Sequence, residues 1–142
     1  RLEGMAGPRA AIEGTDIVVT AGPILRQPQP IVEAGWLAEG ALGAPLDYDS
    51  YWKPEALRRA DRFYTDDARQ LLHTAAGGVY FRDIPEIYAD LGEVLAGLKD
   101  GRRDDRERLV CMSLGIAMDD MATAPLVLEA ARRRGLGTPL PL

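Results

Sequence analysis

Two aspartates and a lysine lie close together in the segment DYDSYWK, which begins at Asp47 and contains Asp49 and Lys53. The segment directly follows an apolar run, residues 41–46, that predicts a buried strand. A carboxylate beside an ammonium at the end of a strand can donate and accept protons in amine chemistry. The same residue types are common in solvated loops, so this spacing alone does not decide between a catalytic site and a surface turn. We therefore treat Asp47, Asp49 and Lys53 as candidate catalytic residues.

A second candidate site consists of Ser113, Leu114 and Gly115, which separate an apolar run at residues 109–112 from a long helical pattern at 116–134. N–H groups at a helix amino terminus carry partial positive charge. Together with the serine hydroxyl, they can hold the amide of a nicotinamide or the carboxylate of a substrate. The alternative is an ordinary helix cap, in which Ser113 closes the first turn and Gly115 allows a tight bend.

A third candidate site lies where the β-branched run of residues 16–20 ends. Thr20 is its last residue, and Ala21, Gly22 and Pro23 follow. A hydroxyl and free amides at the end of a strand can contact a ribose or a nicotinamide. The alternative is that Thr20 only ends the strand and caps the turn.

Several other kinds of site and partner are disfavoured. The single histidine, His73, and the single cysteine, Cys111, supply too few ligands for a zinc site, and we expect Cys111 to be a buried, inert thiol. The formal net charge of -5 opposes binding to nucleic acid. No apolar run approaches the ~20 residues that span a membrane, and no signal peptide is visible. We expect a cytoplasmic protein that binds no membrane.

The elements that must position these residues alternate between strands and helices. Apolar runs predict strands at residues 16–20, 41–46, 60–64 and 109–112. Helices are expected at residues 8–13, 31–37, 54–59, 66–74, 84–98 and 116–134, with a kink or break near Pro125. This alternation predicts an α/β fold, specifically the second half of a Rossmann-like parallel sheet with carboxy-terminal helices.

One expected feature of a dinucleotide site is missing from these residues. Such a site normally has a strand, the pattern G-x-G-x-x-G and a helix, because the glycines let the backbone approach the pyrophosphate. None of the 15 glycines follows a strand in that spacing. A complete nucleotide site therefore cannot be argued from local motifs alone.

Three segments in chain order carry a family resemblance. They are TDIVVTAGP at residues 15–23, PEALRRADRFYTDD at 54–67, and ADLGEVLAGLKDGRRDDRERLVCMSLGIAMDD at 89–120. Together they resemble the ornithine cyclodeaminase/mu-crystallin family, and the third segment is the most specific. The resemblance covers nearly the whole chain after the first dozen residues.

The resemblance implies a function as well as a fold. Family members bind NAD or NADP on a Rossmann domain and use a second domain for dimerisation and substrate binding. It thus implies a homodimeric NAD(P)-dependent oxidoreductase or deaminase of the ornithine cyclodeaminase type, acting on a small amino acid or a cyclic imine. The alternative within the family is a non-enzymatic protein of the mu-crystallin kind that binds NADP(H) or a small ligand.

The resemblance also assigns roles to the cofactor-side residues. Thr20 and Ala21 would approach the nicotinamide end of the cofactor. Ser113, with Leu114 and Gly115, would contact the nicotinamide or the substrate.

The catalytic aspartate of the family is harder to place, although it follows the strand that matches residues 41–46. Matching the pattern Asp-x-x-x-Lys selects Asp49 and Lys53. A gapless match through PEALRRAD instead puts Pro45 at the aspartate position, and Asp47 lies between these solutions. We prefer Asp49, with Asp47 as its rival. Neither matches the usual Asp-x-Pro-Gly-Lys turn, so ornithine itself is a doubtful substrate.

The family's substrate and dimer segments and its Gly-rich loop have no counterpart in these residues. We therefore expect the chain to be the carboxy-terminal part of a longer protein and to be inactive alone. In this interpretation residues 1–115 form a partial NAD(P)-binding domain that lacks its Gly-rich first half. Residues 116–142 form a helix and tail that return toward the substrate and dimer domain.

Overall fold

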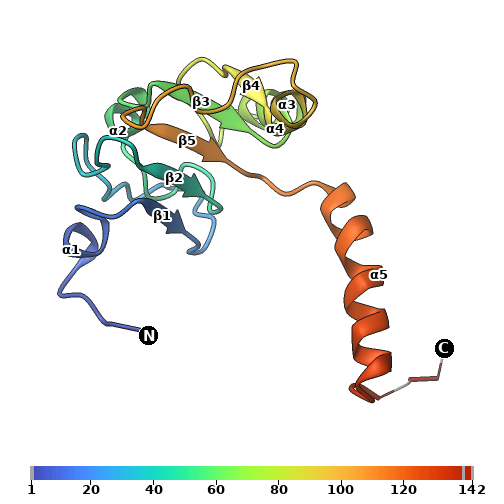
Figure 1. The fold of residues 1–142 in the computed structure, drawn as a ribbon. Coiled ribbons are helices and arrows are strands. Elements are labelled where there is room, and N and C mark those ends of the chain that lie inside the picture. Colours follow the sequence, from blue (N-terminus) through green and yellow to red (C-terminus); the bar gives the residue numbers. More distant parts are fainter. Residues whose placement is uncertain (1, 139, 142) are drawn as a thin grey trace.

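The computed structural model describes residues 2–138 and 140–141. These residues form a five-stranded sheet with flanking helices (Figure 1). The strands are β1 Ile17–Thr20, β2 Leu42–Pro45, β3 Arg62–Thr65, β4 Ala89–Asp90 and β5 Leu109–Met112. The helices are α1 Pro8–Ile12, α2 Pro54–Arg58, α3 Ala68–Ala76, α4 Leu91–Leu95 and α5 Ala117–Arg133. Every strand pairing is parallel, so the predicted α/β fold with a parallel sheet is confirmed.

The strand order is β1-β2-β5-β3-β4, which places the last strand of the chain in the middle of the sheet. The ladder between β1 and β2 joins four residue pairs, whereas the ladder between β2 and β5 joins only two. Pro45, at the end of β2, has no N–H, so it can accept a ladder hydrogen bond but cannot donate one. The β2–β5 ladder accordingly stops short of the carboxyl edge of the sheet.

The main core lies on one face of the sheet. It contains large side chains with almost no exposed surface: Val32, Trp52, Leu57, Leu71, Val110 and Met112. Gly43 in β2 is needed here, because a Cβ at this position would lie 2.7 Å from a ring carbon of Trp52. A smaller cluster around Tyr64, Ala89 and Leu109 occupies the other face.

Two predicted helices are wrong. Residues 84–88 are not helical; Tyr88 donates its backbone N–H to the Phe63 carbonyl at 2.8 Å, and β4 pairs with β3. A helix begins only after Asp90, whose side chain and Glu93 form a capping box, and it lasts five residues. The segment 31–37 is also not helical, since Val32 forms a parallel bridge with Trp52. The boundaries of the other predicted elements differ by one or two residues.

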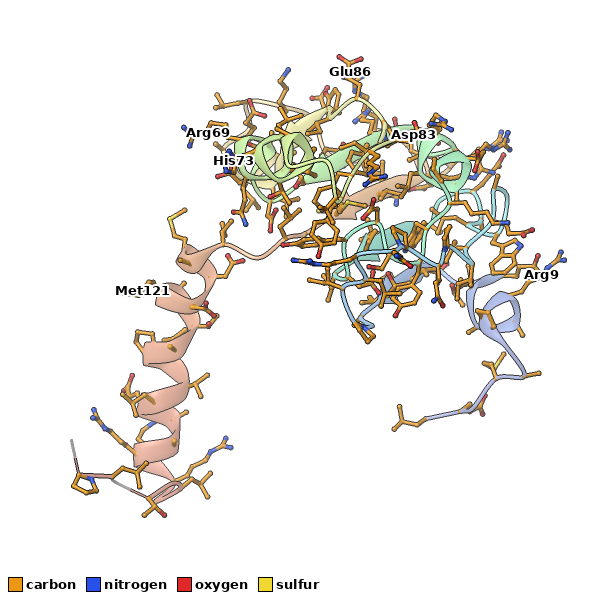
Figure 2. All side chains as sticks on the ribbon, turned by 180° about the vertical axis from the view of Figure 1, so that it is seen from behind. Arg9, Arg69, His73, Asp83, Glu86 and Met121 are labelled. Atoms are coloured by element: carbon orange, nitrogen blue, oxygen red, sulfur yellow. The ribbon has the colours of Figure 1, made fainter. Side chains whose placement is uncertain are left out.

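Helix α5 extends away from the sheet, as Figure 1 shows, and none of its residues is buried. Met121, labelled in Figure 2, lies on this helix far from the core. The helix continues through Pro125, so of the predicted kink or break the break is absent. Its large apolar side chains are exposed, among them Met118, Met121, Leu126, Val127 and Leu128. In the described part of the chain, neither α5 nor any other helix combines the length and apolarity required to cross a membrane.

Candidate functional site

Three of the predicted segments meet at the carboxyl edge of the sheet. Leu46 donates its N–H to the Thr20 carbonyl at 2.9 Å, which fixes the end of β2 beside the end of β1. Ser113 donates its N–H to the Pro45 carbonyl at 3.1 Å, which fixes the end of β5 beside the end of β2. Thr20, Asp47 and Ser113 therefore follow three adjacent strands. In parallel sheets this edge is where ligands bind.

Asp47 connects β2 to β1 and has no exposed surface. One carboxylate oxygen accepts the Thr20 hydroxyl at 2.7 Å, and the other accepts the Gly22 N–H at 2.9 Å. The Thr20 hydroxyl in turn accepts a hydrogen bond from the Trp52 indole N–H at 2.9 Å. The bonding capacity of Thr20 is thus used inside the protein, and Asp47 fixes the turn that presents Ala21.

A cavity of about 440 Å³ lies beside β1, and we refer to it as the β1 cavity. Its wall includes all four β1 residues, Ala21, Gly22, Asp47 and Tyr51. Ile17 and Val19 are more than half exposed along it. The predicted cofactor contacts Thr20 and Ala21 therefore share a cavity with Asp47.

Asp66 organises the segment that contains Ser113. One of its oxygens accepts the N–H groups of Leu114 at 2.8 Å and Gly115 at 2.6 Å. The two amides that were predicted to hold a ligand are therefore already hydrogen-bonded to Asp66. The sequence alone places Asp66 only at the start of the helix predicted at residues 66–74. Nothing local reveals its partner, because the adjacency of β3 and β5 is not visible in the sequence.

The hydroxyl of Ser113 remains available for a ligand. Its one hydrogen-bond partner among the described residues is the Cys111 thiol, at 3.9 Å. The capping alternative for Ser113 is wrong, because the residue preceding α5 is Ile116. Ser113 is therefore a half-buried hydroxyl at the carboxyl edge with no strong bond to other described residues.

Asp49 points into a different part of the molecule from Asp47. One carboxylate oxygen accepts the Phe81 N–H at 2.8 Å, and the other is buried with no hydrogen-bond partner among the described residues. Asp49 lines a second cavity, of about 590 Å³, which we call the Asp49 cavity. No residue lines both cavities. Val32 and Tyr51, which are joined by a backbone hydrogen bond of 2.9 Å, line the β1 cavity and not the Asp49 cavity.

Lys53 forms its ion pair with Glu33, at 2.6 Å between Nζ and Oε1. The hydrogen bond from Lys53, together with its charge, lowers the pKa of Glu33 below its ordinary value. Lys53 lines neither cavity. The spacing between Asp49 and Lys53 thus does not produce an ion pair between these two residues.

The remaining candidate groups are simpler. Cys111 is half-buried, and burial raises the pKa of its thiol. His73 is exposed on α3 (Figure 2). Across residues 2–138 and 140–141, no three metal-binding side chains lie close enough together to hold an ion.

Comparison with known proteins places these observations in context. The model of the ornithine cyclodeaminase/mu-crystallin family matches residues 2–135. An uncharacterized cyclodeaminase of Sinorhizobium fredii is 33% identical over 141 residues, covering 92% of this chain and 41% of that protein. The chain thus spans about two fifths of the length of this curated relative.

Two solved structures share the fold. The Δ1-pyrroline-2-carboxylate reductase of Thermococcus litoralis, in complex with NADH and L-proline, superposes with a TM-score of 0.68 at 29% identity, over 93% of this chain and 42% of that one. A dimeric archaeal alanine dehydrogenase with bound NAD gives a TM-score of 0.67 at 29% identity, over 94% and 43%. Both relatives hold a nicotinamide dinucleotide.

Proposed function

Because this chain belongs to the ornithine cyclodeaminase/mu-crystallin family, we propose that it forms the nicotinamide side of an NAD(P)-dependent oxidoreductase or deaminase acting on a small amino acid or a cyclic imine. The observation that carries the proposal is the adjacency of Thr20, Asp47 and Ser113 at one carboxyl edge. NAD or NADP, when bound, supplies or takes up the hydride. The residues of this chain hold the cofactor in place and handle the proton.

We call the proposed site the nicotinamide wall. It consists of two groups that contact the nicotinamide and two carboxylates that position those groups. The Ser113 hydroxyl and the backbone at Ala21 contact the nicotinamide end, since both lie at the edge and neither is used in a strong internal bond among the described residues. Asp47 and Asp66 are positioning residues, because each carboxylate accepts two donors from the segments that present those contacts. Such preorganised groups need no rearrangement when the ligand binds.

We propose that Asp47, besides positioning the turn at Ala21, is also the proton-handling group, in preference to Asp49. Asp47 lines the same cavity as Thr20 and Ala21, whereas Asp49 lines the other one. To reach a substrate amine, Asp47 would exchange its bond from the Gly22 N–H for one from the substrate, and catalytic bonds often form only in the complex. The proposal gives Lys53 no part in catalysis, because its ammonium pairs with Glu33.

Helix α5 suggests how the chain meets the rest of such an enzyme. Its exposed apolar side chains need a partner surface, since runs of exposed apolar residues mark contact sites. We place this surface on the substrate and dimer domain of a homodimeric protein, so that α5 connects the two domains.

Binding of half-cofactors tests the nicotinamide wall directly. In saturation-transfer NMR, we expect nicotinamide mononucleotide to receive saturation from the protein and adenosine monophosphate to receive little. Ser113→Ala should weaken the nicotinamide mononucleotide signal, and Thr123→Ala, a matched change on exposed α5, should not. Equal signals from both nucleotides, or an unchanged signal in Ser113→Ala, would refute the proposed wall.

The second candidate function is a binding protein of the mu-crystallin kind. The observation in its favour is that Asp47 is wholly buried with both oxygens bonded, so no free carboxylate faces the β1 cavity. Hydride transfer by the complete protein separates the two functions. Tight binding of NADH or NADPH without turnover of amino acids or cyclic imines would support the binding protein.

A further inference from the structure

The Asp49 cavity lies outside the proposed nicotinamide site and has the size of a small-molecule pocket, about 590 Å³. Its floor is apolar, formed by Trp52 and Leu57, which are each 1% exposed. Pro28, from a loop, and Pro54, the first residue of α2, add rigid walls. These surfaces suit an apolar body rather than a water-filled channel.

Two guanidinium groups at this cavity lack a carboxylate partner. Within the described residues, Arg26 makes no ion pair or hydrogen bond, and the only bond from the Arg82 guanidinium goes to the Gly78 carbonyl at 2.7 Å. Asp83, also in the wall, is already paired with Arg58 at 2.5 Å. Arginine binds carboxylates in a planar, two-pronged geometry, so this pair of side chains offers an anion site.

Asp49 supplies an opposite charge with an unmet hydrogen-bonding need. Its buried Oδ1 has no partner in the described part of the chain, and an unpaired buried acceptor costs stability. Two non-glycine residues with left-handed backbones hold it there: Tyr48, with φ of 60°, precedes it, and Phe81, with φ of 56°, donates to its other oxygen. Strain of this kind persists where the surrounding structure enforces it and clusters at ligand clamps.

We propose that the Asp49 cavity binds a free α-amino acid with an apolar side chain. The carboxylate of the ligand lies at Arg26 and Arg82, and its side chain rests on Trp52 and Leu57. Its ammonium pairs with Asp49 when that side chain rotates its buried Oδ1, which has no partner among the described residues, into the cavity. This site is separate from the β1 cavity and does not depend on the proposed redox function. It binds its ligand without a nicotinamide cofactor.

Calorimetric titration with L-leucine, in the absence of cofactor, tests the site. Two analogues complete the set: 4-methylpentanoate lacks the amine, and 3-methylbutylamine lacks the carboxylate. We expect saturable binding of leucine and at least about tenfold weaker binding of either analogue, since each loses one charged hydrogen-bonding end. No saturable leucine binding, or equal binding of 4-methylpentanoate, would overturn the proposal.

Matched variants localise the binding. Arg82→Gln and Asp49→Asn should each weaken leucine binding by about tenfold or more. Arg69→Gln and Asp120→Asn are controls with exposed side chains, and Figure 2 shows Arg69 well apart from Asp83. Arg82 is exposed, so its replacement should leave the melting temperature unchanged. If Arg82→Gln binds leucine as well as Arg69→Gln does, the ligand is not in this cavity.

Discussion

The β1 cavity and the Asp49 cavity are lined by two aspartates that are only two positions apart in the chain, yet the two carboxylates differ in their hydrogen bonding. Asp47 is fully buried, and both of its oxygens accept hydrogen bonds. Asp49 has one bonded oxygen and one without a partner among the described residues. One aspartate thus satisfies its hydrogen bonds within the framework, whereas its near neighbour has an oxygen that the described residues leave unsatisfied.

The backbone of Tyr48 separates the two carboxylates. Its φ of 60° is left-handed, which costs a non-glycine residue about 1–2 kcal/mol. Aromatic contacts compensate, because the Tyr48 ring lies 4.8 Å from the Phe81 ring and 5.3 Å from the Tyr80 ring. The turn therefore places the carboxylates of Asp47 and Asp49 at different cavities, and the strain at Tyr48 is a modest energetic cost.

The largest effect should come from Asp47→Ala. This change leaves the Gly22 N–H and the Thr20 hydroxyl without their charged acceptor, so we expect a loss of about 3–5 kcal/mol in the free energy of unfolding. Urea unfolding followed by circular dichroism measures it. Asp120→Ala on exposed α5 is the control and should change stability by less than about 0.5 kcal/mol. If both changes have the same effect, Asp47 does not hold the edge together.

A smaller loss is expected for Asp66→Ala. The carboxylate is half-buried and accepts the N–H groups of Leu114 and Gly115, so its removal should cost about 2–3 kcal/mol. Hydrogen exchange by NMR should show faster exchange at these two amides than elsewhere on the carboxyl edge. Uniform acceleration over the whole sheet would instead indicate global destabilisation and no specific role for Asp66.

Asp49→Ala should change stability by less than about 1 kcal/mol. The substitution removes a bond from the Phe81 N–H, but it also removes a buried oxygen without a partner, and the two effects oppose each other. The same urea series measures it. A loss as large as that of Asp47→Ala would erase the distinction between the two turn residues. Loss of turnover in Asp49→Asn of the complete protein would place both cavities in one catalytic site.

The smallest effect concerns Lys53, which the sequence pattern placed with Asp49. The folded-state pKa of Glu33 is lowered by Lys53, so the stability contributed by this pair is present above the ordinary glutamate pKa of about 4.3 and is lost as pH falls through the lowered pKa. NMR titration of Glu33 should show the lowered pKa, and Lys53→Ala should raise it toward the ordinary value. No change in Lys53→Ala would leave Lys53 free to serve Asp49.

Most strands were predictable because apolar and β-branched runs are typical of strands, even in β1, where Ile17 and Val19 are more than half exposed. The helix predicted at 84–98 failed because its apolar spacing has another cause: Tyr88 and Ala89 lie beside β3. A signal was present, since Asp90 and Glu93 have the spacing of a capping box, which starts a helix at that point. Periodicity alone cannot show whether such apolar residues are buried by forming a helix or by pairing with a neighbouring strand.

The candidate site was predictable only where it follows strand ends. Thr20 and Ser113 were placed at neighbouring strand ends in this way, and their contact with a cofactor stays a prediction. Two relatives with bound NADH or NAD agree with the predicted class of cofactor. The partners of Asp47 and Asp66 were not predictable, because they depend on which strands are neighbours. The separation of Asp47 from Asp49 depends on the left-handed Tyr48, which its residue type does not suggest.

The position of β5 in the sheet has a consequence for the order of assembly. The chain delivers β1 with β2 and β3 with β4, but these pairs meet only through β5, whose last residue is Met112. During synthesis from the amino terminus, the β1–β2 pair and the β3–β4 pair remain separate and incompletely buried until β5 leaves the ribosome. Long-range pairing of this kind slows folding and leaves strand edges exposed to aggregation. A ribosome stalled before residue 109 should therefore carry a chain with no completed sheet.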